Sequence, residues 1–192
     1  NGNNGFRLDG ASKYDGAGRS VSNAGDVNGD GFDDLIVGAF GTDSNGRAAP
    51  SSDYVVFGKA SGFDAAMDLS TLDGSNGFRL INGVEKHSYL NASVSSAGDV
   101  NGDGFNDLIV GSSGVNQEGY NGGSYVVFGK ATDFDAAMDL ANLDGSNGFQ
   151  LNSATSGFPS VAFSSAGDVN GDGFDDLIIG SPEASSYDGT GD

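Results

Sequence analysis

Residues 168–176 read Asp168-Val169-Asn170-Gly171-Asp172-Gly173-Phe174-Asp175-Asp176, and this nine-residue stretch occurs three times in the chain. The copy at 26–34 is identical, and the copy at 99–107 differs only by Asn106 at the eighth position. In every copy, side chains with oxygen atoms stand at positions 1, 3, 5 and 9, and glycine stands at position 6. Two carboxylates roughly 4–5 Å apart repel by about 3–4 kcal/mol at an effective dielectric of about 20. A hard cation with about six to eight oxygen ligands removes this repulsion, so the pattern predicts three Ca²⁺ sites.

The predicted ligands are the side chains at positions 1, 3, 5 and 9 and the backbone carbonyl at position 7. They are Asp26, Asn28, Asp30, Phe32 and Asp34 in the first copy, Asp99, Asn101, Asp103, Phe105 and Asp107 in the second, and Asp168, Asn170, Asp172, Phe174 and Asp176 in the third. Because position 8 changes to Asn106 in one copy, we leave it outside the ligand set. The phenylalanine at position 7 would give only its carbonyl, so its side chain is predicted to pack inward.

Two other kinds of loop use similar residues. An acidic turn, closed by its own aspartates without any metal, uses the same residue types. An EF-hand needs glutamate at position 12 and a helix on each side, whereas position 12 here is Val37, Val110 or Ile179. Short β-branched runs that end in glycine follow each loop, and these indicate strands rather than helices. Each loop is therefore predicted to join two strands.

Composition limits the class of protein. The chain has 192 residues and a net charge of −19, which disfavours nucleic acid or an anionic membrane as a partner. It has no cysteine, which excludes disulfides and thiolate metal sites, and no apolar run long enough to insert into a membrane. Calcium modules of modest affinity fill at extracellular calcium levels and stay mostly empty in the cytosol. We therefore expect an extracellular or cell-surface location.

Repeated signals divide the chain into units of about 71 residues. The units span approximately 1–82, 83–151 and 152–192, with the last one truncated, and form a single array of roughly 2.7 repeats. In the first unit, strands are expected near 19–25, 34–39, 53–58 and 77–82, with the acidic loop between the first two. The insert at 63–72 is expected to form a short helical turn.

The apolar runs determine the predicted architecture. Leu35-Ile36-Val37 and the run at 54–57 are continuously apolar, so both faces of these strands need cover. A β-propeller supplies that cover because each four-stranded antiparallel blade packs between two neighbours. The sequence therefore predicts an all-β protein made of propeller blades. Propellers close with about four or more blades, so we expect either a fragment of a larger propeller or copies that assemble. The exposed blade edges predict possible self-association.

Residues 24–39 resemble the FG-GAP repeat of integrin α-subunit propellers and their bacterial relatives, and the resemblance extends over all three units. It implies a propeller with Ca²⁺ in the first hairpin loop of each blade, held by the ligands named above. The Phe-Gly that opens the family's first strand is absent near Gly18-Arg19, and Gly111-Ser112-Ser113 replaces its Gly-Ala-Pro. These departures favour a secreted or surface protein of bacterial type over an integrin proper.

Residues for catalysis are scarce. His87 is the one histidine, and it lies in a connection without a counterpart in the other units. Further acids outside the loops do not repeat; they include Asp15, Asp43, Glu118 and Glu183. We therefore predict no enzyme activity, and a calcium-binding structural or adhesion module of an extracellular protein, with a possible protein or carbohydrate ligand on the blade loops. The alternative is an accessory propeller domain of a secreted hydrolase or lyase whose catalytic residues lie elsewhere.

Overall fold

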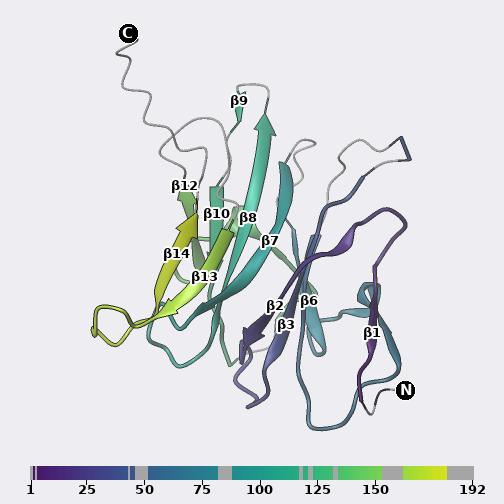
Figure 1. Ribbon diagram of the computed structural model, residues 1–192, viewed down its shortest axis with the longest axis horizontal. Coiled ribbons are helices and arrows are strands. Elements are labelled where there is room, and N and C mark those ends of the chain that lie inside the picture. Colours follow the sequence, from purple (N-terminus) through teal and green to yellow (C-terminus); the bar gives the residue numbers. More distant parts are fainter. Residues whose placement is uncertain are drawn as a thin grey trace.

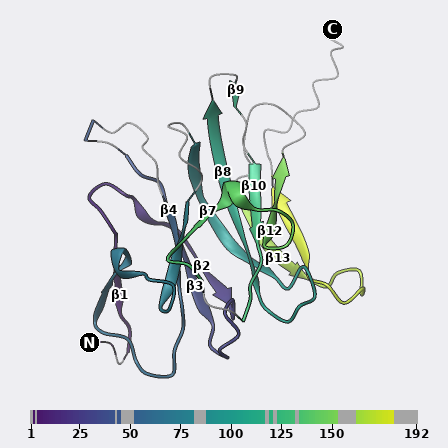
Figure 2. The same cartoon turned by 180° about the vertical axis from the view of Figure 1, so that it is seen from behind.

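The continuously apolar runs form the central strands of twisted sheets that pack face to face. The computed structural model describes residues 2, 4–42, 44–45, 52–81, 88–116, 119–120, 123–131, 134–152 and 162–180. Among these residues, three mainly antiparallel sheets follow one another in chain order (Figure 1), beside a small parallel sheet of two strands. The view from behind shows β4 and β10 in the first two of the antiparallel sheets (Figure 2). We call these sheets blades 1, 2 and 3.

Blade 1 has the strand order β2-β3-β4-β6, with neighbouring strands antiparallel. Its strands are β2 (Ala17–Gly25), β3 (Asp34–Ala39), β4 (Ser52–Val56) and β6 (Gly77–Ile81). Blade 2 repeats the order as β7-β8-β10-β12, with a short β9 beside β8. Its strands are β7 (Ser88–Gly98), β8 (Asp107–Asn116), β9 (Gly119–Tyr120), β10 (Gly123–Val127) and β12 (Gly148–Asn152). In blade 3 the described strands are β13 (Ala162–Gly167) and β14 (Asp176–Gly180). The prediction of an all-β fold of blade-type antiparallel sheets is confirmed, and the described residues do not close a ring.

A parallel strand from the insert of blade 2 joins the sheet of blade 1, which the sequence did not predict. β11 (Ala137–Asp139) comes from the insert of blade 2 and pairs in parallel with β6 of blade 1. In the same way β5 (Ala66–Asp68) pairs with β1 (Arg7–Asp9). A 3₁₀ turn follows each inserted strand: η1 (Leu69–Thr71) and η2 (Leu140–Asn142). The predicted helical turn is therefore present, but it is shorter than expected and a strand precedes it.

Aromatic rings reinforce this link. Phe78 of β6 stacks on Phe134 from the following insert, with ring centroids 4.5 Å apart. The amine of Lys130 lies 4.7 Å from the centroid of the Phe134 ring. Phe6 and Phe63 stack in the same manner at 4.0 Å. Stacked rings with a cation over one face add favourable contacts beyond simple burial.

Both faces of the central strands of blade 2 are covered. On one face, Ile36 and Phe78 of blade 1 pack with Val94 and Leu108 of blade 2. The opposite face of blade 2 packs on blade 3, and Ile109, which directly follows Leu108, is fully buried there. Successive side chains of a strand point to opposite faces, so full burial of two consecutive residues requires cover on both sides. The continuously apolar strands of blade 2 are therefore covered on both faces, as expected for a propeller blade between two neighbours.

Candidate metal centres

The three acidic loops are the hairpins between the first and second strands of each blade, and they lie at the same end of the three sheets (Figure 1). Glycines at positions 4 and 6 allow the chain to turn there. Gly29 and Gly31 have φ values of +74° and +88°, and the glycines of the other two loops have nearly the same values. These are backbone conformations that other residues adopt only with strain. The ninth position opens the second strand, as at Asp34 in β3.

The carboxylate at position 1 organises each loop. Asp26 Oδ1 accepts the N–H groups of Gly29 at 2.7 Å and Asp30 at 3.0 Å, and Oδ2 accepts the N–H of Gly31 at 2.9 Å. Asp99 and Asp168 accept the corresponding three N–H groups in their own loops. These hydrogen bonds favour the ionised form and lower the pKa of the Asp168 carboxyl below its ordinary value, with the Gly173 N–H as the main cause.

The side chains at positions 3 and 5 form further turns inside the loop. Asn28 Oδ1 accepts the N–H of Asp30 at 2.9 Å, and Asp30 Oδ1 accepts the N–H of Phe32 at 2.9 Å. The amide Nδ2 of Asn28 donates to Asp30 Oδ2 at 3.2 Å. The second loop repeats this pattern, whereas Asn170 of the third loop donates to Asp176 Oδ1 at 3.4 Å instead. Positions 1, 3 and 5 thus all present oxygen atoms within one turn.

The carboxylate at position 9 is buried in blades 1 and 2. Asp34 Oδ2 accepts the N–H of Val27 at 2.9 Å, and its Oδ1 accepts the N–H of Gly58 at 2.8 Å. The pKa of Asp34 is raised to about 6, chiefly by burial and to a smaller extent by the negative charges of Asp30 and Asp26, while the two hydrogen bonds act to lower it. Asp107 has the same surroundings and its pKa is likewise raised to about 6, chiefly by burial. A buried carboxylate next to two others is therefore a destabilised anion, which a cation would relieve.

The chemistry of the donor set fits calcium only if the ion also takes neutral oxygens. Among the described residues, no three Asp, Glu, His or Cys side chains group closely enough to hold a metal ion by themselves. The asparagine at position 3 and the carbonyl at position 7 would have to complete the set. Calcium accepts amide and backbone carbonyl oxygens readily, together with water, so this composition suits it better than zinc.

The phenylalanine at position 7 does not pack inward as predicted. Phe32 is 40% exposed and Phe174 is 46% exposed. The ring of Phe105 instead covers Gly29 of the preceding loop, and the ring of Phe174 covers Gly102. The reason is that the hairpin tip lies beyond the sheet, where only a neighbouring loop supplies a surface.

Position 8, which sequence analysis set aside, contacts the neighbouring blade. Asn106 and Asp175 each exchange two hydrogen bonds with the first residue of the preceding loop. The sequence contains one sign of this contact, since a glycine precedes every loop.

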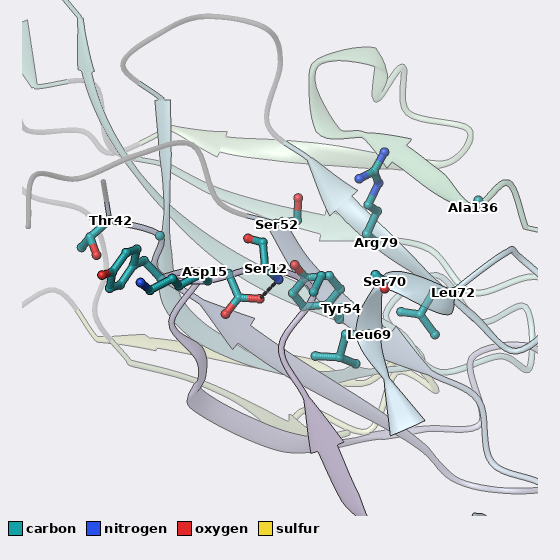
Figure 3. Close-up of a pocket in the computed structure, with 14 residues that line it drawn as sticks. Ser12, Asp15, Thr42, Ser52, Tyr54, Leu69, Ser70, Leu72, Arg79 and Ala136 are labelled. Atoms are coloured by element: carbon teal, nitrogen blue, oxygen red, sulfur yellow. Dashed lines mark hydrogen bonds between the residues drawn. The ribbon is translucent and has the colours of Figure 1, made fainter. Parts of the chain in front are cut away.

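The scattered acids do not form a second centre in the described structure. Asp15 lines a pocket of about 500 Å³, in which Tyr54 and Arg79 also take part, and it accepts the N–H of Ser12 at 3.2 Å (Figure 3). Asp15 is the one acidic residue in the described lining of this pocket. His87, Asp43, Glu118 and Glu183 lie outside the described residues. No helix in the described ranges has the length and apolar character needed to cross a membrane.

The sheets and loops define a class of protein: a repeat array of blade-type β-sheets, each with an acidic hairpin at one end. The FG-GAP repeat matches residues 17–49, 91–127 and 161–192, which together make up more than half of the chain. The chain belongs to the FG-GAP repeat family.

Curated relatives contain the same region. The chain is 32% identical over 173 residues to phosphatidylinositol-glycan-specific phospholipase D of Bos taurus, covering 83% of this chain and 18% of that protein. It is 28% identical over 166 residues to integrin alpha-5 of Xenopus laevis, covering 85% of this chain and 14% of that protein. The human phospholipase D is 31% identical, again over 83% of this chain and 18% of its own length. The chain thus spans less than one fifth of the length of these relatives.

Proposed function

We propose that this chain is a calcium-stabilised structural or adhesion module of an extracellular or cell-surface protein, without catalytic activity of its own. The observation that carries the proposal is the loop arrangement: one carboxylate fixes the turn, and a buried carboxylate whose pKa is raised to about 6 lies near two further acids. Three such loops at one end of the array would take three Ca²⁺ ions. The relatives support a module of this kind because one of them is an integrin subunit.

The ion would act on stability rather than on chemistry. The chain's residues would hold it through positions 1, 3, 5 and 9 and the carbonyl at position 7, and the ion would supply a positive charge that offsets the carboxylate repulsion. An ion that binds only the folded state stabilises it by RT ln(1 + [Ca²⁺]/Kd), about 1.4 kcal/mol per site at ten times Kd. Three sites would make the blade array strongly dependent on calcium.

The test is thermal unfolding and calorimetric titration of the full chain. We expect about three ions per chain and a clear fall of Tm in EDTA. Asp30→Ala should reduce the stoichiometry by one, whereas the matched substitution Asp33→Asn at position 8 should leave it unchanged, since Asn106 already occupies that position in the second loop. Equal melting curves in calcium and in EDTA, with no heat of binding, would refute the proposal.

A second candidate function is an accessory blade array of a secreted hydrolase or lyase. The match to a phospholipase D favours it, since that protein carries the region within a much longer chain. The single acid in the described lining of the Asp15 pocket gives no pair of carboxylates for acid–base chemistry, so catalytic residues would lie in another part of such an enzyme. Both proposals include a protein or carbohydrate ligand on the blade loops. Binding of the chain to an immobilised glycan or protein panel would distinguish ligand recognition from a purely structural role.

A further inference from the structure

Position 8 of one loop and position 1 of the loop before it form a reciprocal pair of hydrogen bonds. The backbone N–H of Asn106 donates to the carbonyl of Asp26 at 3.0 Å, and the N–H of Asp26 donates to Asn106 Oδ1 at 2.9 Å. The two residues are 80 positions apart in the chain. Asp175 makes the same pair with Asp99, at 3.0 Å to the carbonyl and 2.9 Å from the N–H to Oδ2. We call each of these pairs a clamp.

The glycine before each loop makes room for the clamp. A Cβ atom at Gly25 would overlap the side chain of Asn106, and a Cβ at Gly98 would overlap that of Asp175. The third copy shows that this overlap comes from the neighbouring blade and not from the turn itself. At Gly167 nothing described lies within 4 Å of the Cβ position, although its φ of +66° resembles the +72° of Gly25.

Further contacts join the first loop to blade 2. The Phe105 ring covers Gly29, and the N–H of Lys130 donates to the carbonyl of Val27 at 3.0 Å. Consecutive loops therefore touch through the clamp and through Phe105, and the segment after β10 adds a further contact with the first loop.

Each clamp connects residues of two different candidate sites. We number the candidate calcium sites 1, 2 and 3 in the order of their loops along the chain. Asp26 is the first predicted ligand of site 1, and Asn106 stands between Phe105 and Asp107, two predicted ligands of site 2. From this placement we propose that Asn106 and Asp175 are positioning residues that couple adjacent calcium sites, so that loading one site raises the affinity of its neighbour. This inference rests on the proposed calcium binding.

The physical argument concerns order. An ion at site 2 would hold residues 105–107 in one conformation, and Asn106 would then hold the peptide groups on both sides of Asp26 in place. Site 1 would pay less ordering entropy when its own ion arrives. Coupling between two binding equilibria is reciprocal, so site 1 assists site 2 by the same factor. Sites 2 and 3 would be coupled through Asp175, and sites 1 and 3 only through site 2.

Blade 1 supplies a matched control. Asp33 occupies position 8 there, and its Oδ2 accepts Nδ2 of Asn23 at 3.0 Å within the same hairpin. In the part of the chain that the structure describes, Asp33 forms no clamp with another loop. A substitution at Asp33 thus changes the same loop position without touching a second site.

The first experiment isolates one coupled pair. In the full chain with Asp172→Ala, site 3 is disabled, and calcium titration by calorimetry should show two ions with the second bound at least about five-fold more tightly than the first. Adding Asn106→Ala should make the two sites independent. Adding Asn106→Asp, which keeps the acceptor, or Asp33→Ala should preserve the cooperativity. Two sites of equal, independent affinity in the Asp172→Ala chain would overturn the proposal. Loss of the cooperativity on adding Asp33→Ala would also overturn it.

The second experiment leaves the clamp intact, so it does not depend on the folding of the Asn106 variant. In the Asp30→Ala chain site 1 cannot fill, yet filling site 2 should slow hydrogen exchange at the Asp26 amide by about five-fold or more. An Asp26 amide that exchanges equally fast with and without calcium would contradict coupling. If no variant or parent chain bound calcium at all, the proposed function itself would fail, which is a different result from binding by independent sites.

Discussion

The Asp53 carboxylate of β4 accepts the N–H of Ala39 in β3 at 2.8 Å, and its other oxygen, Oδ2, is buried without a hydrogen-bond partner among the described residues. Burial raises the pKa of this carboxyl well above its ordinary value, more than the Ala39 hydrogen bond lowers it. The equivalent position of blade 2 is Ser124, which is also buried. Blade 1 thus carries an acid where its neighbour carries a small neutral residue.

We expect Asp53→Ser to stabilise the protein at neutral pH. An unsatisfied buried polar oxygen costs roughly 1–3 kcal/mol, which corresponds to about 2–4 °C in Tm per kcal/mol for a chain of this size. Because the folded state keeps a proton on Asp53 that the unfolded chain loses above about pH 4, the gain should grow as the pH rises above that value. Melting curves at about pH 4.5 and pH 8 would check this. Ser124→Ala is the control, and a lower Tm for Asp53→Ser at pH 8 would contradict the expectation.

The pH dependence of stability should be much weaker with calcium than without it. The pKa values of Asp34 and Asp107 are raised from 3.8 to about 6 in the folded state. Without calcium, the folded state therefore binds more protons than the unfolded chain between about pH 4 and 6, and stability falls as the pH rises through this window. Calcium needs the deprotonated carboxylates, so in saturating calcium the folded state holds few of these protons and the fall in stability over the same window should largely disappear.

Melting curves in EDTA and in calcium across this range would measure the effect. The Tm difference between the two conditions should be small near pH 5 and large near pH 7.5. In the Asp34→Asn/Asp107→Asn double variant the EDTA curve should lose most of its slope. Parallel curves for the parent chain in both conditions would argue against calcium in these loops.

The strands were predictable because their side-chain pattern is local. Residues 34–39, expected as a strand from an apolar run that ends in glycine, form β3 with the same bounds. The parallel strands β5 and β11 were not predictable, since each has only three residues and pairs with a strand far away in the sequence. A stretch of that length has no periodicity of its own, and tertiary pairing decides its conformation.

The loops likewise combine a local feature that the sequence predicts with a long-range contact that it does not. The turn geometry around Asp26 follows from residue types within nine positions, so the sequence indicated it. The clamp between Asn106 and Asp26 joins residues 80 positions apart, and from the sequence alone the Asp/Asn change at position 8 indicates only that this position is not a ligand. Both oxygen-bearing residue types can accept the N–H, which explains why either serves in a clamp.

The glycine before the loop offers a test of blade packing that does not involve calcium. Alanine at Gly98 and at Gly167 must adopt nearly the same positive φ, +76° and +66°, and each substitution costs roughly 1–2 kcal/mol for that reason. Only at Gly98 would the new Cβ also displace a neighbour, the Asp175 side chain. Gly98→Ala should therefore be less stable than Gly167→Ala by roughly 1–3 kcal/mol, the typical cost of overpacking. Urea unfolding in EDTA measures the difference, and equal stabilities would show that the clamp contributes little.

On the outer sides of blades 1 and 3, the described residues include exposed apolar side chains whose equivalents are buried between blades. Ile36 and Val27 of blade 1 are fully buried under blade 2, whereas their equivalents in blade 3, Ile178 and Val169, are 61% and 74% exposed. At the other end Val21 is 67% exposed, although its equivalent in blade 2, Val94, is 5% exposed. The open face of blade 3 thus matches the open face of blade 1 in the same way that consecutive blades match.

We therefore predict that this chain associates head to tail with a second copy, blade 3 of one chain on blade 1 of the next, as a heterologous interface allows. Light scattering should show a mass that rises with protein concentration. Ile178→Glu should reduce the association by placing a charge on the buried face, and Ala131→Glu, at an exposed loop position, should not. Because the loops of adjacent blades touch, calcium should strengthen the association. A mass that stays monomeric over the accessible concentrations, in calcium and in EDTA, would refute this prediction.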